Sequence, residues 1–417
     1  MMANSSEASR KMGGGAAIYG PLLHILKFFA PQLDQQLVMA REAVNNNRSN
    51  FKRWAKIISL WIIGLLILYR CIILTINQRS AMADMILMGL NANQLTVSLL
   101  ALLGYLFICY CQYDGFLTSF PQHVESATRL KALKSAEAGG DYLRPWHVFW
   151  LISPVAILAL IGAAEVELYR RQSHLEEENI VRGILQYPNI LLFAPNAFIL
   201  LWSVVSLISS IALLSLLHKT VVNELSYFNN EIIEAATNGH LQHVDLLSNY
   251  VSRHIDILDI CHTFNERISV FVSLWIILAG FGIICNVVNL FASDGNWPIA
   301  CLSVVLIAFW TLHSGAIIGN CFSLIAQIQR TRHLVLYEKS IWHNANEKVY
   351  LLVIGMAKRI EEFHHLQLAG IATIKPRLFA FFIVLLSTGL VLLTQNRLLS
   401  LMNDGAYEKN FLNTTIQ

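Results

Sequence analysis

Charged side chains are scarce in this sequence. Asp, Glu, Lys and Arg make up 14% of its 417 residues, whereas soluble globular proteins carry about 25%. Hydrophobic residues make up 55% of the chain. This balance excludes an ordinary soluble domain and indicates an integral membrane protein.

Several signatures of soluble function are also missing. The net charge is only +3 and no basic run alternates with aromatic residues, so nucleic-acid binding has no support. The sequence contains no phosphate-binding loop, no dinucleotide-binding glycine pattern and no nucleophile elbow, so we expect neither an enzyme nor a cofactor. No short apolar run followed by a small-residue cleavage site stands near the start, so we expect no signal peptide.

The seven cysteines and 14 histidines form no recognisable metal motif. Cys109 and Cys111 lie together near the end of one apolar helix and lack zinc-site spacing. His240 and His243 stand three residues apart on an expected helix, which suits either a metal site or a solvated helix face. Because no further ligand pattern accompanies them, we expect buried cysteines, solvated histidines and no bound metal.

Seven segments are apolar and long enough to cross a bilayer, which takes roughly 20 residues. Each must be helical, because lipid offers no partners to backbone N–H and C=O groups. The expected fold class is therefore an all-α integral membrane protein with seven transmembrane helices. The segments are residues 54–76, 94–113, 146–164, 190–217, 268–292, 297–324 and 378–394.

Lys and Arg are unevenly distributed between the connections. Twenty-three of the 30 lie before or at the very start of the first segment, or after the second, fourth and sixth segments; six lie in the alternate set, and the remaining one is Arg70. Since positive charge favours the cytoplasmic side, we expect a cytoplasmic N-terminus and an extracellular C-terminus. A G-protein-coupled receptor has the reverse orientation. Arg70 lies near the outer end of the first segment, where we expect its side chain to snorkel to the interface.

The large connections fall on the expected cytoplasmic side. Apolar residues recur at helical spacing after the fourth and sixth segments, with a break at Asn238-Gly239. Apolar stripes outside the membrane need a partner, so we expect these helices to meet in a cytoplasmic anchor domain. The expected organisation is a cytoplasmic N-terminal region (1–53), transmembrane helices 1–4 (54–217), a cytoplasmic helical extension (218–267), transmembrane helices 5–6 (268–324), cytoplasmic anchor helices (325–377), transmembrane helix 7 (378–396) and an extracellular tail (397–417).

The expected outer side has three features of interest. An acidic loop after the third segment is either a solvated face or, if several copies ring a pore, a region that concentrates cations. It contains Glu165, Glu167, Glu176, Glu177 and Glu178. Aromatic residues and a histidine crowd the fourth and sixth segments, either as interface belt and core packing or as a small-ligand pocket. They are Phe193, Phe198, Trp202, Phe309, Trp310 and His313. The tail carries a glycosylation candidate at Asn413.

Charged residues are nearly absent from the centres of the seven segments. Proton-coupled transporters depend on ionisable side chains at that depth. The scarcity therefore argues against a transporter of this class.

Polar residues interrupt the last segment, which contains "LLSTGLVLLTQNR" at residues 385–397. At about 100° per residue, Thr388, Leu392, Gln395 and Asn396 fall on one helix face. This face is either a helix–helix contact or the wall of a water-accessible pathway with Leu392 as a hydrophobic constriction. One helix cannot enclose a pore, so the pathway needs several copies of the chain around a symmetry axis.

These features resemble the insect gustatory and odorant receptor superfamily. The inverted seven-helix order and the large cytoplasmic helical region before the last span are similar. The family signature of the last span is Thr-Tyr, five apolar residues and Gln-Phe, and this chain has Thr388-Gly389 and Gln395-Asn396 at that separation. Gly389 replaces the Tyr, Asn396 replaces the Phe, and Thr394 interrupts the apolar run.

The resemblance implies a ligand-gated, non-selective cation channel in the plasma membrane. It implies a homotetramer whose last helices line a central pore, with Leu392 at the gate, Gln395 at the motif position, Asn396 just outside it and Thr388 on the same face. The implied partners are further copies of the chain, a small organic ligand or lipid, and permeating cations. The alternative is a membrane receptor or lipid-binding scaffold of the same fold that does not conduct.

Overall fold

The computed structural model describes residues 18–29, 46–80, 85–131, 144–177, 190–293, 296–342, 346–363, 367–368 and 372–373. Within these ranges, five helical segments are long and apolar enough to cross a membrane: Ile58–Ile76, Met85–Tyr113, Pro195–Thr237, Val244–Ala292 and Trp297–Tyr337. They overlap five of the seven predicted spans. The third predicted span lies in a further helix, and the seventh lies outside the described residues. The chain is thus a multi-pass helical membrane protein.

The elements follow one another along the chain almost entirely as helices. The helices are α3 (Leu22–Phe29), α5 (Asn46–Ser80), α6 (Met85–Tyr113), α7 (Phe116–Thr128), α9 (Arg144–Glu177), α10 (Ile190–Thr237), the short 3-10 helix η2 (His240–Gln242), α11 (Val244–Ala292), α12 (Trp297–Tyr337), α13 (Lys339–Trp342) and α14 (Glu347–Glu362). A small antiparallel hairpin, β1 (Gln367–Leu368) with β2 (Ala372–Thr373), follows α14 and was not expected from the sequence.

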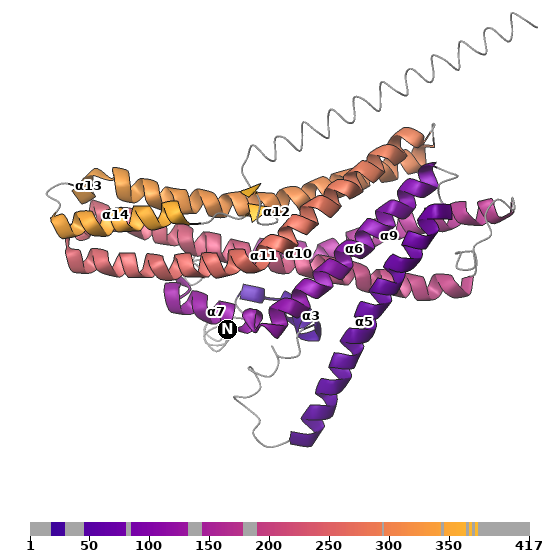
Figure 1. The fold of residues 1–417 in the computed structure, drawn as a ribbon, viewed down its shortest axis with the longest axis horizontal. Helices are drawn as coiled ribbons and strands as arrows, with labels where there is room; N and C mark the ends of the chain where they lie inside the picture. The colour runs from indigo at the N-terminus through magenta and orange to yellow at the C-terminus, as the bar shows by residue number, and fades with distance from the viewer. Residues whose placement is uncertain are drawn as a thin grey trace, which may run out of the picture.

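Three very long helices, α10, α11 and α12, run along the long axis of the molecule (Figure 1). The 48 residues of α10 span about 70 Å, more than twice the roughly 30 Å of a hydrocarbon core. A large part of each helix therefore extends beyond the membrane, as the sequence predicted. At the left-hand end in Figure 1, α13 and α14 lie beside the ends of α10 and α12; we call this the α14 end.

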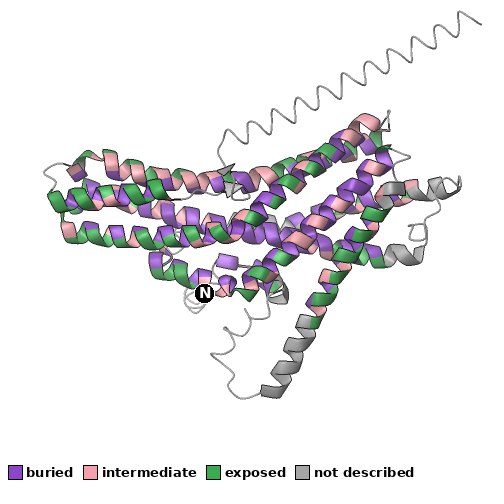
Figure 2. Ribbon diagram, in the orientation of Figure 1, coloured by how far each residue is buried: buried purple, intermediate pink, exposed green. Residues whose placement is uncertain are grey.

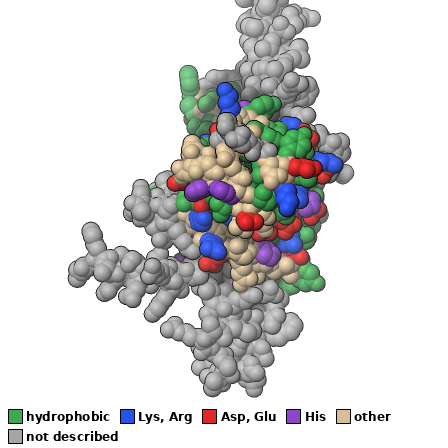
Figure 3. Space-filling model, turned by 90° about the vertical axis from the view of Figure 1, so that its left-hand side faces the viewer, with side chains coloured by type: hydrophobic (Ala, Val, Ile, Leu, Met, Phe, Trp, Pro, Cys, Tyr) green, Lys and Arg blue, Asp and Glu red, His purple; other side chains and the backbone are tan. Residues whose placement is uncertain are grey.

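Charged side chains gather at the α14 end. Figure 3 looks onto it and shows basic, acidic and histidine side chains spread among polar and apolar ones. Among the ion pairs here, Glu231 on α10 accepts from Arg253 on α11 at 2.8 Å. A surface of this composition belongs in water, so this end of the bundle lies outside the hydrocarbon.

The break predicted at Asn238-Gly239 is confirmed. Helix α10 ends at Thr237, and Gly239 follows with a φ of 73°. Glycine adopts this left-handed conformation without the steric cost that a Cβ would add. The chain reverses there through η2, and α11 returns alongside α10.

Helix α14 buries the apolar stripe that its spacing predicted. Its buried side chains include Val349, Val353, Met356 and Ile360. The side chain of Asn346 caps its start by accepting from the backbone N–H of Lys348 at 3.3 Å, which satisfies one unpaired donor of the first turn. The buried stripe faces α12 and α11, the helices that α14 contacts most.

The other end of the molecule is a bundle of α5, α6, α9, α10, α11 and α12. Figure 2 shows buried residues along α6 and α10, which lie between the others, whereas α5 is exposed along one side. The hydroxyl of Tyr105 on α6 donates to the Leu60 carbonyl on α5 at 2.7 Å. Near α3, Tyr19 donates to the Leu117 carbonyl at 2.9 Å, and burial raises the pKa of its phenol, so it stays protonated as a donor.

Candidate functional site

The first turns of α6 carry an unusual density of buried polar side chains. The helix begins at Met85 rather than at the predicted Gln94, because the polar stretch "NANQLTVS" at residues 91–98 lies inside it. The buried polar residues are Asn91, Asn93, Gln94, Thr96 and Ser98. Buried polar groups must be hydrogen-bonded to be tolerated, so their partners identify what this end of the bundle is built around.

Arg70 on α5 points into the bundle and is only 1% exposed. The prediction that it snorkels to the interface is therefore wrong. Its Nη2 lies 2.7 Å from Oε2 of Glu165 on α9, and its Nη1 lies 3.4 Å from Oε1 of the same carboxylate. A guanidinium carries its donors in a fixed fork, which suits a carboxylate inside a protein better than it suits a lipid headgroup boundary.

Glu165 is likewise not in an acidic loop. Helix α9 continues to Glu177, so Glu165 and Glu167 are helical, and Glu165 is only 3% exposed. Arg70 lies within the apolar segment Ile58–Ile76, near its outer end as predicted, so the new finding is the buried carboxylate that it meets. The signal available in the sequence was a single Arg and a single Glu, each within or directly after an apolar span and each near the same end of the bundle.

Three further side chains complete this site. Gln94 Oε1 accepts from Arg70 at 3.3 Å, and Ser98 Oγ accepts from Arg70 Nε at 3.1 Å. Asn196 on α10 bonds to both charged groups, accepting from Arg70 and donating to Glu165. We call Arg70, Gln94, Ser98, Glu165 and Asn196 the polar core; it joins α5, α6, α9 and α10.

Burying the polar core costs a membrane protein free energy. Taking an ion pair out of water costs several kcal/mol per ion, and replacing such pairs with apolar residues is often neutral or stabilising. Ionisable residues in membrane spans usually mark functional positions for this reason. We therefore take the polar core as the candidate functional site.

A second buried network lies next to it on α6. Asn93 Oδ1 accepts from Asn286 Nδ2 on α11 at 2.8 Å and from Trp310 Nε1 on α12 at 3.1 Å. We call Asn93, Asn286 and Trp310 the amide cluster. Gly282 lies one turn before Asn286, and its carbonyl accepts from that amide at 2.7 Å. The cluster ties α11 and α12 to the helix that also carries the polar core.

The predicted pocket residues fall on two helices. On α12, Phe309 contacts Trp310 and His313, with ring centroids 4.9 and 4.2 Å apart. On α10, the ring of Phe198 lies edge-on to Trp202 at 6.3 Å, and Phe198 is 54% exposed. Phe193 is also on α10, but its side chain is not among those described. The structure brings the residues of each helix together; a shared ligand pocket stays a prediction.

The predicted pore residues lie outside the described part of the chain. They are Thr388, Leu392, Gln395 and Asn396; Glu178 and Asn413 also lie outside it, as do the side chains of Glu176 and Glu177. His240 belongs to η2, whereas His243 is the N-cap residue of α11. The expectation that both lie on one helix is therefore wrong. No group of three or more His, Cys, Asp or Glu suited to a metal ion occurs in the described ranges.

Solved structures that match the fold include two of an insect olfactory receptor. The insect olfactory receptor OR5 from Machilis hrabei matches with a TM-score of 0.53 and 13% identity, over 85% of this chain and 92% of the receptor. The same receptor in complex with eugenol matches with a TM-score of 0.60 and 14% identity over the same shares. The chain thus has the fold of an insect chemoreceptor, as the resemblance predicted. No curated protein matches it in sequence.

A family model described as "Caenorhabditis protein of unknown function, DUF267" matches residues 18–399. This match covers nearly the whole chain, from Ile18 to just beyond the predicted seventh span. The chain therefore belongs to the DUF267 family of Caenorhabditis proteins of unknown function, whose fold here is that of the insect olfactory receptors.

Proposed function

We propose that this chain is a subunit of a ligand-gated, non-selective cation channel of the chemoreceptor type. The observation that carries the proposal is the likeness to the insect olfactory receptor OR5, which extends over 92% of that receptor with a TM-score of 0.60. A fold alone does not determine a function. The proposal therefore also draws on the last span, where Thr388 and Gln395 stand at the separation of the receptor family's motif.

In this proposal the chain crosses the membrane seven times, with a cytoplasmic N-terminus and an extracellular C-terminus. Four copies surround a central axis, and residues 378–396 line the pore. Leu392 forms the hydrophobic gate, and Gln395 and Asn396 offer amide groups to partly hydrated cations. The charged α14 end supports a cytoplasmic anchor domain at residues 325–377.

The proposed ligand is a small organic molecule that binds the open state more tightly than the closed state and so shifts the balance between them. Its pocket lies at the end of the bundle opposite the α14 end, among the aromatic residues of α10 and α12. The polar core and the amide cluster add hydrogen-bonding groups to this region. They favour a ligand that carries a polar group over a pure hydrocarbon.

Whole-cell recording tests the proposal directly. Cells expressing the chain are recorded before and during exposure to a panel of small organic molecules, and surface expression is measured in parallel. We expect currents carried by both Na⁺ and K⁺. Leu392→Ala should raise the current without ligand, because a smaller side chain weakens the dewetted constriction, and Gln395→Ala should change relative permeability. Leu390→Ala, which falls on the opposite face of the predicted helix at about 100° per residue, is the matched control.

The contrary outcome is equally specific. If the chain reaches the surface but no compound evokes a current, and Leu392→Ala adds no leak, the chain does not conduct. A lipid that co-purifies with the protein would then favour the non-conducting receptor or scaffold.

A further inference from the structure

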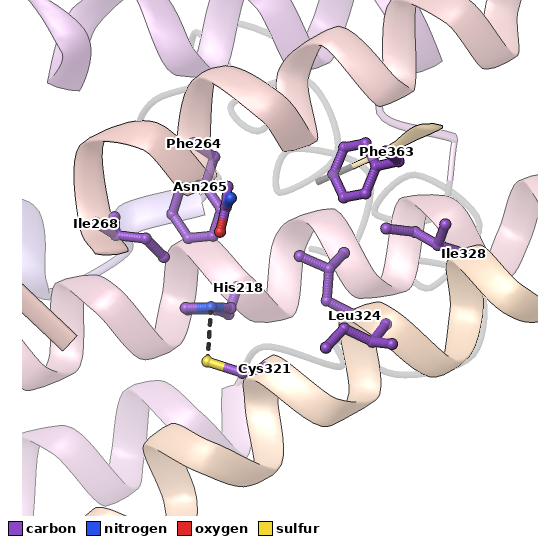
Figure 4. Close-up of a pocket in the computed structure, with 9 residues that line it drawn as sticks. His218, Phe264, Asn265, Ile268, Cys321, Leu324, Ile328 and Phe363 are labelled. Carbon is purple, nitrogen blue, oxygen red and sulfur yellow. Dashed lines mark hydrogen bonds between the residues drawn. The ribbon is translucent and has the colours of Figure 1, made fainter. Parts of the chain in front are cut away.

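A small cavity lies where α10, α11 and α12 meet. It has a volume of about 10 Å³, room for roughly one water molecule or one ion. Figure 4 shows its lining side chains converging from the three helices, with Phe363 closing it from beyond α14. Its polar side chains are His218 on α10, Asn265 on α11 and Cys321 on α12.

His218 is held in one tautomer and one orientation. Its Nδ1 lies 3.0 Å from the carbonyl oxygen of Leu214, one turn earlier on α10. A carbonyl can only accept, so Nδ1 carries the proton and Nε2 carries the lone pair. The ring of Phe264 packs edge-on against the imidazole at 4.6 Å, which fixes its plane. Histidines that bind metals usually have the same arrangement, with the second nitrogen donating to a carbonyl.

The Cys321 thiol donates a hydrogen bond to the lone pair of His218 Nε2, drawn as a dashed line in Figure 4. Nε2 and Sγ lie 3.5 Å apart, and both side chains are buried. A zinc-like ion with bonds of about 2.0 Å to nitrogen and about 2.3 Å to sulfur, at a tetrahedral angle, places these two atoms about 3.5 Å apart. A linear two-coordinate ion with similar bonds would need about 4.3 Å. The spacing therefore suits a tetrahedral ion.

We propose that His218 and Cys321 form a binding site for a single zinc-like divalent cation. The pair supplies two strong ligands, and the Asn265 side chain, which also lines the cavity, offers a third. On binding, the thiol of Cys321 gives its proton to solvent as the sulfur–metal bond forms. With two strong ligands the site binds reversibly, unlike a closed structural site with four.

A bound ion would link α10 to α12 across the face of α11. These helices continue from the apolar bundle toward the α14 end, so the link would restrain their relative movement. This binding does not depend on ion conduction and can be measured on protein that conducts nothing.

The experiment titrates purified full-length protein with Cd²⁺, which reports its bonds to sulfur as an ultraviolet charge-transfer band. We expect one thiolate-bound Cd²⁺ per chain, release of one proton per ion, and competition by Zn²⁺ but not by Mg²⁺. His218→Gln should weaken Cd²⁺ binding about tenfold or more. Cys321→Ser should abolish the band. Cys285→Ala, which removes another buried thiol from α11, should leave the titration unchanged.

Three results would overturn the proposal. One is the absence of a thiolate band in the folded wild-type protein. Another is a band that persists in Cys321→Ser or disappears equally in Cys285→Ala. The third is Cd²⁺ binding without a band, which points to exposed histidines such as His240. If Cys321→Ser does not fold, His218→Gln decides the question, because it keeps the thiol and removes only the nitrogen ligand.

Discussion

Arg70 and Glu165 depend on each other because neither has access to water. Removing one partner of a buried pair leaves the other charge uncompensated, which typically costs about 3–5 kcal/mol. We therefore expect Glu165→Leu to lower stability strongly. The double variant Arg70→Met/Glu165→Leu should recover most of the loss, because it removes both charges. Thermal unfolding of the purified protein in detergent measures both effects.

Glu167 is the control for this comparison. It is two residues from Glu165 on α9 and pairs with Arg171 at 3.1 Å, but both partners are partly exposed. Such pairs contribute roughly 0–1 kcal/mol, so Glu167→Leu should have little effect. Equal melting temperatures for Glu165→Leu and Glu167→Leu would show that the polar core contributes no special stability.

Gly282 on α11 tests the amide cluster. A Cβ at this position would lie 2.9 Å from Nε1 and 3.0 Å from Cε2 of Trp310, so the indole must move and its bond to Asn93 must lengthen. We expect Gly282→Ala to cost about 1–3 kcal/mol, as overpacked cores do. Gly280→Ala is the matched control, because its Cβ would meet nothing within 4 Å. If the two variants unfold at the same temperature, Trp310 is not confined as described.

The sequence contains both Arg70 and Glu165, but it does not predict that their side chains meet in the candidate site. Hydropathy identified the span that contains Arg70, but the direction of its side chain depends on Glu165, which lies far along the chain on α9. For an isolated helix, the side chain of such an arginine is predicted to extend to the membrane interface. Only tertiary packing reveals a buried counter-charge. A polar stretch inside an apolar helix, such as residues 91–98, was the available sign that this end of the bundle holds a polar interior.

At the scale of elements, helix type and extent could be predicted well from apolar spacing. The extensions of α10, α11 and α12 beyond the apolar spans, the break before Gly239 and the buried stripe of α14 all followed from local pattern. The start of α6 and the length of α9 could not be predicted in this way, because polar residues at helix ends resemble loop residues unless their hydrogen-bond partners are known. The hairpin β1–β2 is too short to give a periodic signal.

Helices α10 and α12 are joined by a side-chain network beyond the predicted spans 190–217 and 297–324. Asn229 Nδ2 donates to the Gln327 carbonyl at 3.0 Å, and its Oδ1 accepts from Thr331 at 2.6 Å. Asn229→Ala removes these bonds and should cost about 1–3 kcal/mol locally. We expect faster amide hydrogen exchange in residues 225–237 and 325–337, because local opening becomes easier.

The neighbouring Asn230 provides the control for that measurement. It is exposed, and its oxygen lies 3.4 Å from Arg330, a weak surface contact. Exposed substitutions of this kind usually change stability by less than about 0.5 kcal/mol. If Asn229→Ala and Asn230→Ala exchange at the same rate in these segments, the network does not hold the two helices together.

At the scale of the whole molecule, the uneven distribution of Lys and Arg predicts which end faces the cytoplasm. The long helices run from an apolar bundle to the charged α14 end. Only the apolar bundle fits within the hydrocarbon core of a membrane. If the positive-inside rule holds, the α14 end is cytoplasmic and residues 397–417 are extracellular.

Epitope tags and glycosylation test this orientation in intact cells. A tag at the N-terminus should bind antibody only after permeabilisation, and a tag at the C-terminus should bind it without. Asn413, in the predicted extracellular tail, should carry an N-linked glycan, so Asn413→Gln should remove the mobility shift caused by glycosidase treatment. Asn47→Gln should not, because the sequon at Asn47 lies on the predicted cytoplasmic side. An N-terminal tag that binds antibody in intact cells would reverse the orientation, and it would place the α14 end outside the cell, where it could not act as a cytoplasmic anchor.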